Sequence, residues 1–424
     1  MQLIDFIGAE LKIIIFIENV QNGGLDTFCS TLINNWPNSD DVFTIICNKS
    51  HPGRANMENS INRPCIFAYH RIPLSWVFTK QVFFFFPYFL SRMLQPFLRI
   101  PFFPLQYLLI RNIFRKNDGD RLLVINGGFP GGESCRIANI VWYGMGRGRS
   151  IHNFHNFAVK PRFGFGWYEN WIDRLLLKST KLFISVSKSC SDSLKIRKTF
   201  ENLTNNMYVY NGINDAPSVE NNFNIRKNIG IDDSPICLML GTYEPRKGHD
   251  FIFKAFEKVV KELPNAHLVI CGGGSKNEII KVKKLKNKLT ATDNIHLLEF
   301  IPNGASLISQ VDVVLIGSQE FESFGLTAVE SMVRKKPVVS TDIGGLPEVL
   351  SMDNSCGFVV NHQDEAAFSA KIILLLKDQK LRDEMGMAGR VRALKLFSAE
   401  RMSMDYLMAV KEVNSSDGSK NIIL

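Results

Sequence analysis

Short, continuous runs of apolar residues recur along this chain, and each is followed by a glycine-rich or polar loop and then by residues with helical spacing. In the first half these runs occupy residues 11–17, 42–47, 122–125, 137–141 and 182–186. Buried strands that alternate with helices are typical of a parallel sheet that is covered on both faces. We therefore expect an α/β fold built from doubly wound, Rossmann-like domains.

The pattern begins again after a polar stretch at 215–233. The second series predicts strands at 236–240, 267–271, 295–298, 313–316 and 337–340, and helices at 250–263, 277–289, from 324 and at 364–376. We place one domain at 1–215 and another at 216–397, followed at 398–424 by a helix that packs on the first domain and a frayed tail. Two such domains would face each other across a cleft at the carboxyl ends of their strands.

Composition and charge narrow the class of protein. The eight cysteines stand singly, without a C-x-x-C pair, so neither a zinc cluster nor a disulfide framework is encoded. A formal net charge of +9 favours an anionic partner, such as nucleic acid, a lipid surface or a phosphorylated substrate. The N-terminus has no basic region, and Asp5, Glu10 and Lys12 interrupt its apolar stretch, so we expect no signal peptide and a cytoplasmic protein.

Residues 59–117 interrupt the alternation of strands and helices. They contain eight basic residues, fifteen aromatic residues and no acidic residue. Their longest uncharged runs hold eleven residues each, fewer than the roughly 20 that span a bilayer. The segment therefore predicts either a membrane-interface surface or a buried aromatic layer of the first domain. Single-stranded nucleic acid is disfavoured because four consecutive phenylalanines, at 83–86, do not form a spaced stacking platform.

The most informative stretch is ESFGLTAVE at 322–330, which follows a predicted buried strand and opens a helix. Ser323 is a good N-cap, so the next three backbone amides are expected to face the strand ends and attract a phosphate. These are the amides of Phe324, Gly325 and Leu326. Glu330 lies almost two turns into the helix, where its carboxylate could bind vicinal hydroxyls such as those of a ribose. Alone, the stretch also fits an ordinary capped helix with a surface glutamate.

Two further loops are expected at the same edge of the sheet. GGLPE at 344–348 follows the next strand, and GTYEPRKG at 241–248 follows the first strand of the second domain. Arg246 and Lys247 could clamp a diphosphate with charge-assisted hydrogen bonds, or they could be solvated surface charges. The glycines at 272–274 do not complete a dinucleotide fingerprint, because Asn277 occupies the position of its last glycine.

Together these motifs resemble glycosyltransferase family 4, the retaining nucleotide-sugar transferases of the GT-B fold. The resemblance covers most of 210–400, through E-x7-E at 322 and 330, PVV at 337–339, GGLPE at 344–348 and RKG at 246–248. The first half matches more thinly, at 23–24, 152–153, 186–187 and 211–213. The sequence departs from the family at Thr242, where an arginine is common, and at Lys335, where a glycine usually ends the helix.

The resemblance implies a role for particular residues. Glu330 would bind the ribose and Glu322 the donor sugar, while Lys247 and Arg246 would neutralise the leaving diphosphate. His152 would touch the sugar from the first domain, and His155 competes for that role. Further donor contacts are expected at Gly23, Gly24, Gly241, Thr242, Gly273, Phe300, Ile301, Ser323, Phe324, Gly325 and Leu326.

The resemblance also implies a reaction. The chain is expected to be a hexosyltransferase that needs no cofactor and takes a nucleotide-diphosphate sugar, of the UDP or GDP type, as co-substrate. By the resemblance, its product would be a bacterial surface polysaccharide, such as O-antigen or lipopolysaccharide. The basic aromatic segment at 59–117 predicts a lipid-linked or other saccharide acceptor held at the inner face of the plasma membrane. No metal is expected, because the D-x-D at Asp118 and Asp120 precedes a strand instead of ending one. The alternatives are a nucleotide-sugar epimerase or phosphorylase on the same fold, or a non-catalytic membrane-associated protein.

Overall fold

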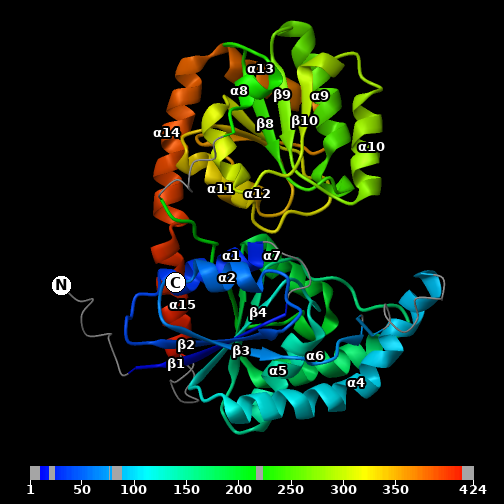
Figure 1. Ribbon diagram of the computed structural model, residues 1–424, viewed down its shortest axis with the longest axis vertical. Coiled ribbons are helices and arrows are strands. Elements are labelled where there is room, and N and C mark those ends of the chain that lie inside the picture. Colours follow the sequence, from blue (N-terminus) through cyan, green and yellow to red (C-terminus); the bar gives the residue numbers. More distant parts are fainter. Residues whose placement is uncertain (1–9, 19–23, 76, 79–87, 216–222, 413–424) are drawn as a thin grey trace. The chain divides into compact units, whose positions relative to one another are not determined.

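The computed structural model describes residues 10–18, 24–75, 77–78, 88–215 and 223–412, and it places side chains for all of these except 88–96. The chain divides into two compact units (Figure 1). One unit contains residues 1–212 and 399–424, and the other contains residues 213–398. The C-terminal helix thus belongs to the first unit.

In the described residues, the first unit forms a seven-stranded parallel sheet with the order β3-β2-β1-β4-β5-β6-β7. Its strands are β1 (Lys12–Ile17), β2 (Val42–Asn48), β3 (Cys65–His70), β4 (Arg121–Asn126), β5 (Ser150–Phe154), β6 (Thr180–Ser185) and β7 (Asn206–Tyr208). Ile15 of β1 pairs with Ile45 of β2 and with Leu123 of β4. A strand between two neighbours, with both faces covered, accounts for the continuous apolar sequence of β1.

Helices cover both faces of this sheet. They are α1 (Gly24–Asn34), α2 (Arg54–Ser60), α4 (Tyr88–Lys116), α5 (Glu133–Gly144), α6 (Gly166–Ser179), α7 (Lys188–Ser193) and α15 (Ala399–Glu412). Alternate residues of β1 enter different cores, as the period of a strand requires. Ile13 and Ile15 pack with residues of α1 and α15, whereas Ile14 and Phe16 pack with residues of α4 and α5.

Within the described residues, the second unit forms a six-stranded parallel sheet with the order β10-β9-β8-β11-β12-β13. The strands are β8 (Ile236–Leu240), β9 (His267–Cys271), β10 (Ile295–Leu298), β11 (Val313–Ile316), β12 (Val338–Thr341) and β13 (Gly357–Val360). The helices are α8 (Ile225–Ile229), α9 (His249–Glu262), α10 (Lys276–Lys286), α11 (Leu326–Val333), α12 (Leu346–Leu350), α13 (Glu365–Lys377) and α14 (Gln379–Leu396). The chain leaves β8 toward β9 on one side and later returns to β11 on the other. This reversal makes the carboxyl ends of β8 and β11 a topological switch point, where ligands bind in such sheets.

The expected α/β fold with two Rossmann-like sheets is confirmed, but the strand predicted at 137–141 is wrong. These residues lie within α5, and the fifth strand of the chain is instead β5 at Ser150–Phe154. Ile137, Ala138 and Val141 are buried. Their spacing of one and three residues fits one side of a helix. An apolar run of five residues is too short to distinguish the period of a helix from that of a strand.

The segment at 59–117 includes β3 and the long helix α4. Ile110 and Phe114 of this helix are fully buried in the core of the first unit. Phe97 and Leu108 are instead 57% and 61% exposed, so α4 has both a packed side and an open side. Among the helices in the described part of the chain, none is both long enough and apolar enough to span a membrane.

Candidate functional site

The loops that follow β8 and β11 meet at two glycines. Gly248 has a left-handed backbone with φ of 73°, and a Cβ atom built on it would lie 1.9 Å from the carbonyl oxygen of Gly317. Only glycine fits both this conformation and this close approach. The backbone amide of Gln319 also donates a 2.7 Å hydrogen bond to the backbone carbonyl of Arg246. The RKG motif is therefore held against the loop after β11.

The loop that follows β12 packs on the same loop after β11. The Gly345 amide donates a 2.9 Å hydrogen bond to the carbonyl oxygen of Glu322. A Cβ atom on Gly344, whose φ is 62°, would lie 2.1 Å from that oxygen. The GGLPE and ESFG motifs are thus neighbours because two glycines let the backbones approach closely. The structure brings the motifs after β8, β11 and β12 together, as expected for carboxyl ends of adjacent parallel strands.

A salt bridge joins two of the predicted catalytic residues. The Lys247 ammonium lies 2.6 Å from a carboxylate oxygen of Glu322, and the Ser318 hydroxyl donates to the same oxygen at 3.1 Å. The two charged side chains are only 19% and 16% exposed. Arg246 is instead paired with Glu244, and its guanidinium lies 4.8 Å from the centre of the Phe321 ring. A cation and a carboxylate are therefore available at one point of the sheet edge.

The helix after the ESFG motif begins later than expected. Ser323 is not its N-cap: α11 starts at Leu326, and its N-cap is Gly325, with φ of 96°. Phe324 is buried, and its ring lies 5.5 Å from that of Phe397. The helix start is therefore set by a left-handed glycine and a buried aromatic anchor. The first backbone amide of α11 is that of Leu326. The amides in the first turn of a helix have no intrahelical partner, so they can bind an anion.

Glu330 lies on the second turn of α11 and has a perturbed carboxyl group. Its removal from water raises its pKa to about 7, although the Arg334 guanidinium favours the charged form. Arg334 also donates a 3.0 Å hydrogen bond to the backbone carbonyl of Glu330. A partly buried carboxyl group whose pKa is raised toward 7 is a candidate for binding a ligand.

The remaining predicted contacts of the second unit follow β8, β9 and β10. The Tyr243 amide donates to the Gly273 carbonyl at 2.9 Å, and a Cβ atom on Gly272 would lie 1.8 Å from the Gly241 carbonyl oxygen. A Cβ atom built on Gly273 would lie 3.5 Å from the Cβ atom of Phe300. Gly273 therefore packs against Phe300. The Phe300 side chain is 72% exposed. Thr242 is exposed and Ile301 is half-buried.

The predicted residues of the first unit are placed differently. Gly23 lies outside the described residues, and Gly24 is exposed at the first position of α1. His152 is fully buried in the middle of β5. Its ring nitrogens lie 2.7 Å and 3.2 Å from the side-chain amide nitrogens of Asn139 and Asn126. Burial lowers its pKa to about 3, so the ring is neutral. A direct contact between His152 and a sugar would need an accessible ring, which this structure does not provide.

His155 lies at the sheet edge, directly after β5. Its ring is half-buried and meets the Phe28 ring of α1 at 4.2 Å. Its backbone amide donates to the Asn126 carbonyl at 3.0 Å. Burial lowers the pKa of His155 to about 3. Of the two histidines considered, His155 is the one at a carboxyl strand end.

Sequence reasoning missed Glu18, which follows β1 directly. Its carboxylate accepts hydrogen bonds from the amide, at 2.9 Å, and from the hydroxyl of Ser134. Burial, with the nearby charge of Glu133, raises the pKa of Glu18 to about 7. A glycine-rich loop at 127–132 follows β4 and also lies at this edge, since a Cβ on Gly132 would lie 2.9 Å from the Glu18 carboxyl carbon. That glycine pattern after a buried strand was the available signal.

The D-x-D pair lies in the short connection between α4 and β4. The Lys12 amide donates to Asp120 at 2.9 Å, and the Lys12 ammonium lies 3.2 Å from Asp118. Within the described residues, no group of three histidine, cysteine, aspartate or glutamate side chains is arranged to hold a metal ion.

Known sequences resemble the second half of the chain. Residues 221–392 match the family described as glycosyl transferases group 1. The chain is 29% identical, over 199 residues, to N-acetyl-alpha-D-glucosaminyl L-malate synthase of Bacillus anthracis. This match covers 47% of the chain and 51% of that protein, so the chain spans about half the length of the curated relative.

Solved structures resemble the chain over nearly its whole length. A glycosyltransferase from Rickettsia africae superposes with a TM-score of 0.75 at 19% identity, covering 96% of this chain and 100% of that one. The Anabaena protein HepE, crystallised in complex with UDP, superposes with a TM-score of 0.71 at 15% identity, covering 95% and 100%. At these identities the likeness concerns the fold, and function has to be argued from the site.

Proposed function

We propose that the chain is a retaining glycosyltransferase of the GT-B fold that uses a nucleotide-diphosphate sugar, because residues 221–392 match the family described as glycosyl transferases group 1. The observation that carries the proposal is the meeting of the loops after β8, β11 and β12 around the ion pair of Lys247 and Glu322. This meeting lies at the topological switch point of the second sheet. The complex of the Anabaena protein with UDP supports a nucleotide-diphosphate donor, and we propose that this donor is of the UDP or GDP type.

In this proposal the diphosphate lies at the amino end of α11. Backbone amides and the cations of Lys247 and Arg246 stabilise the negative charge that develops as the bond between sugar and phosphate breaks. Lys247 exchanges its carboxylate partner for a phosphate oxygen, which frees Glu322 to bind the donor sugar. Glu330 accepts a hydrogen bond from the ribose, and the exposed ring of Phe300 is available to the base.

The configuration of the sugar is retained in this proposal. Departure of the diphosphate leaves an oxocarbenium-like sugar. The acceptor hydroxyl then attacks from the face that the diphosphate leaves, so the new bond has the geometry of the old one. No residue of this chain needs to form a covalent bond with the sugar, and no cofactor is required.

We further propose a hexose as the transferred sugar and a lipid-linked or other saccharide as the acceptor. The product would be a surface polysaccharide, such as an O-antigen of lipopolysaccharide, made at the inner face of the plasma membrane. The support for a membrane-held acceptor is the segment at 59–117, which has no acidic residue and exposes Phe97 and Leu108. A position at the membrane surface would bring the enzyme to such an acceptor.

A transfer assay tests this function. The full-length protein is incubated with labelled UDP-hexoses and GDP-hexoses and with a lipid-linked saccharide extract, and the product linkage is determined by NMR. We expect transfer from one nucleotide type, with retained configuration, and loss of transfer in Glu322→Gln. Conversion of the donor without an acceptor, or a requirement for inorganic phosphate, would instead identify an epimerase or a phosphorylase.

A further inference from the structure

Helix α6 presents an unusual stripe of side chains to solvent. Trp167 and Trp171 are 64% and 43% exposed, and Arg174 and Lys178 are also exposed. Their spacing of four, three and four residues places them on one side of the helix. Single exposed apolar side chains are common, but a contiguous exposed apolar patch on a protein surface typically marks an interaction site.

The loop before α6 continues this stripe. Phe163 is wholly exposed, and Val159 is 55% exposed. Lys160 and Arg162 lie beside them in the sequence and are exposed as well. Over residues 159–178, the most exposed side chains are therefore either apolar or positively charged.

The acidic residues of α6 are turned inward. Glu169 and Asp173 are buried, and each lies 2.8 Å from the guanidinium of Arg197. Arg136 lies 3.6 Å from Asp173, and Arg99 of α4 lies 4.0 Å from Glu169. Both carboxylates are thus neutralised inside the unit. This arrangement leaves the outer side of α6 without negative charge.

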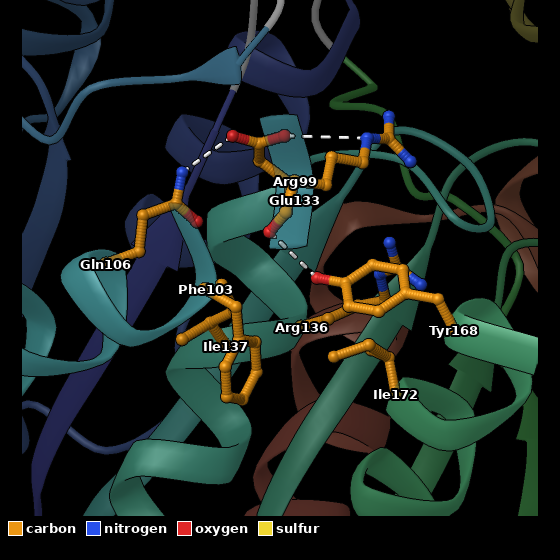
Figure 2. A pocket seen from close by; sticks show the side chains of 8 residues that line it. All are labelled: Arg99, Phe103, Gln106, Glu133, Arg136, Ile137, Tyr168 and Ile172. Atoms are coloured by element: carbon orange, nitrogen blue, oxygen red, sulfur yellow. Dashed lines mark hydrogen bonds and ion pairs between the residues drawn. The ribbon is translucent and has the colours of Figure 1, made fainter. Parts of the chain in front are cut away.

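Figure 2 shows further buried contacts of Arg99, which tie α4 to α5 and α6. Arg99 approaches Glu133 of α5 at 3.6 Å, and its backbone carbonyl accepts a 3.0 Å hydrogen bond from the Tyr168 hydroxyl. Gln106 donates to Glu133 at 2.6 Å. The network fixes α4 beside the start of α6.

Ring contacts make the outer surfaces of α4 and α6 continuous. Phe97 meets Phe165 at 4.5 Å, and Phe103 meets Trp171 at 5.0 Å. The open side of α4 then exposes apolar residues, followed by cations near its C-terminus. These exposed residues are Phe97, Ile100, Leu105, Leu108, Arg111, Arg115 and Lys116.

We propose that this aromatic–basic surface, formed by the exposed residues of 97–116 and 159–178, docks on a bilayer that contains anionic phospholipid. Tryptophan and phenylalanine insert at the boundary between headgroups and acyl chains, and lysine and arginine bind the anionic headgroups. The inference rests on the membrane association in the proposed function and names the surface responsible for it.

Charge and chemistry favour a bilayer over other occupants. A symmetric contact with a second copy of the chain would bring two positive surfaces together. Single-stranded nucleic acid would use the cations and aromatic rings, but it would leave the aliphatic side chains of Val159, Ile100 and Leu108 without partners. A bilayer accommodates aromatic, aliphatic and cationic groups on one surface.

Vesicle binding by the full-length protein tests the proposal. The probes are vesicles of phosphatidylcholine alone and of phosphatidylcholine with phosphatidylglycerol, and binding is measured by co-sedimentation. We expect binding only with phosphatidylglycerol, and weaker binding at high salt. Phe163→Ser/Trp167→Ser should weaken it at least about tenfold through lost burial. Arg174→Gln/Lys178→Gln should weaken it about 25-fold, or about fivefold per charge.

Matched controls come from the second unit. Met352→Ser/Val391→Ser removes apolar side chains that are 66% and 65% exposed, and Lys283→Gln/Lys284→Gln removes two exposed cations. Both controls should bind vesicles as the unaltered protein does. Every altered side chain on the docking surface is exposed. The variants should therefore have the same melting temperature as the unaltered protein.

Several results would overturn the proposal. These are no binding of the unaltered protein to anionic vesicles, unchanged binding of both surface variants, self-association that the aromatic variant abolishes, or tighter binding of single-stranded nucleic acid through the same residues. Stabilisation by nucleotides is measured in parallel. If vesicle binding fails while nucleotides still stabilise the protein, the docking surface is wrong and the donor site stands. If vesicles bind but no nucleotide stabilises the protein, the donor site alone is refuted.

Discussion

Glu330→Gln should make the protein more stable at alkaline pH, although it removes a candidate ligand-binding group. The folded state holds this carboxyl at a pKa of about 7, above its ordinary value of 4.5, because the group is removed from water. A group with a raised pKa contributes stability that is fully present below the unfolded pKa and is lost as the pH rises through the folded pKa. The difference in pKa corresponds to at most about 3 kcal/mol of the free energy of unfolding.

Urea denaturation at several pH values measures this effect. The free energy of unfolding of Glu330→Gln should equal that of the unaltered protein below pH 4.5 and exceed it by up to about 3 kcal/mol at about pH 8. Glu320→Gln neutralises an exposed carboxylate in the preceding loop and controls for the loss of one charge. The reasoning is refuted if, at alkaline pH, the free energy of unfolding of Glu330→Gln is equal to or lower than that of the unaltered protein.

Three further substitutions test the geometry of the site. Lys247→Gln should leave Glu322 without its ion-pair partner and weaken nucleotide binding at least about tenfold in calorimetry, since charge-assisted hydrogen bonds are the strong ones. Gly248→Ala should destabilise the fold by about 3 kcal/mol or more in chemical denaturation, because its Cβ would lie 1.9 Å from the Gly317 oxygen at a φ of 73°. His152→Phe should cost about 2 kcal/mol of stability, because a neutral ring accepts at one nitrogen and its loss leaves one buried asparagine N–H unpaired, yet it should leave the affinity ratio of nucleotide sugar to nucleotide unchanged. A selective loss of the sugar's contribution would instead place His152 in the site.

The sequence predicted the second unit better than the first. Its strands at 236–240, 267–271, 295–298 and 313–316 have the bounds expected from their apolar runs. In the first unit, the apolar run at 137–141 was assigned to a strand, and the actual strand β5 was missed because its sequence, SIHNF, mixes polar and apolar residues. That error hid the burial of His152, since a residue in the middle of a covered strand has no access to the sheet edge.

The residues of the site were predictable where glycines and charges follow strands. Lys247 and Glu322 were expected at one edge, and the structure pairs them directly. The start of α11 was misplaced because Ser323 is a good cap by type, whereas the left-handed Gly325 takes that position. The glycines at 127–132 indicated this part of the sheet edge, but the raised pKa of Glu18 could not be read from the sequence, because it comes from burial in the folded unit and from the nearby charge of Glu133.

Nucleotide binding at the second unit is the most direct test of the central claim. Calorimetric and thermal titration with UDP, GDP and ADP, and with their sugar conjugates, should show one nucleotide type that binds. At about 100 times its dissociation constant this ligand should stabilise the protein by roughly 2.7 kcal/mol. Glu330→Ala and Lys247→Gln should abolish or strongly weaken that effect. No binding of any nucleotide, or equal binding by both variants, would contradict a donor site at the loops after β8, β11 and β12.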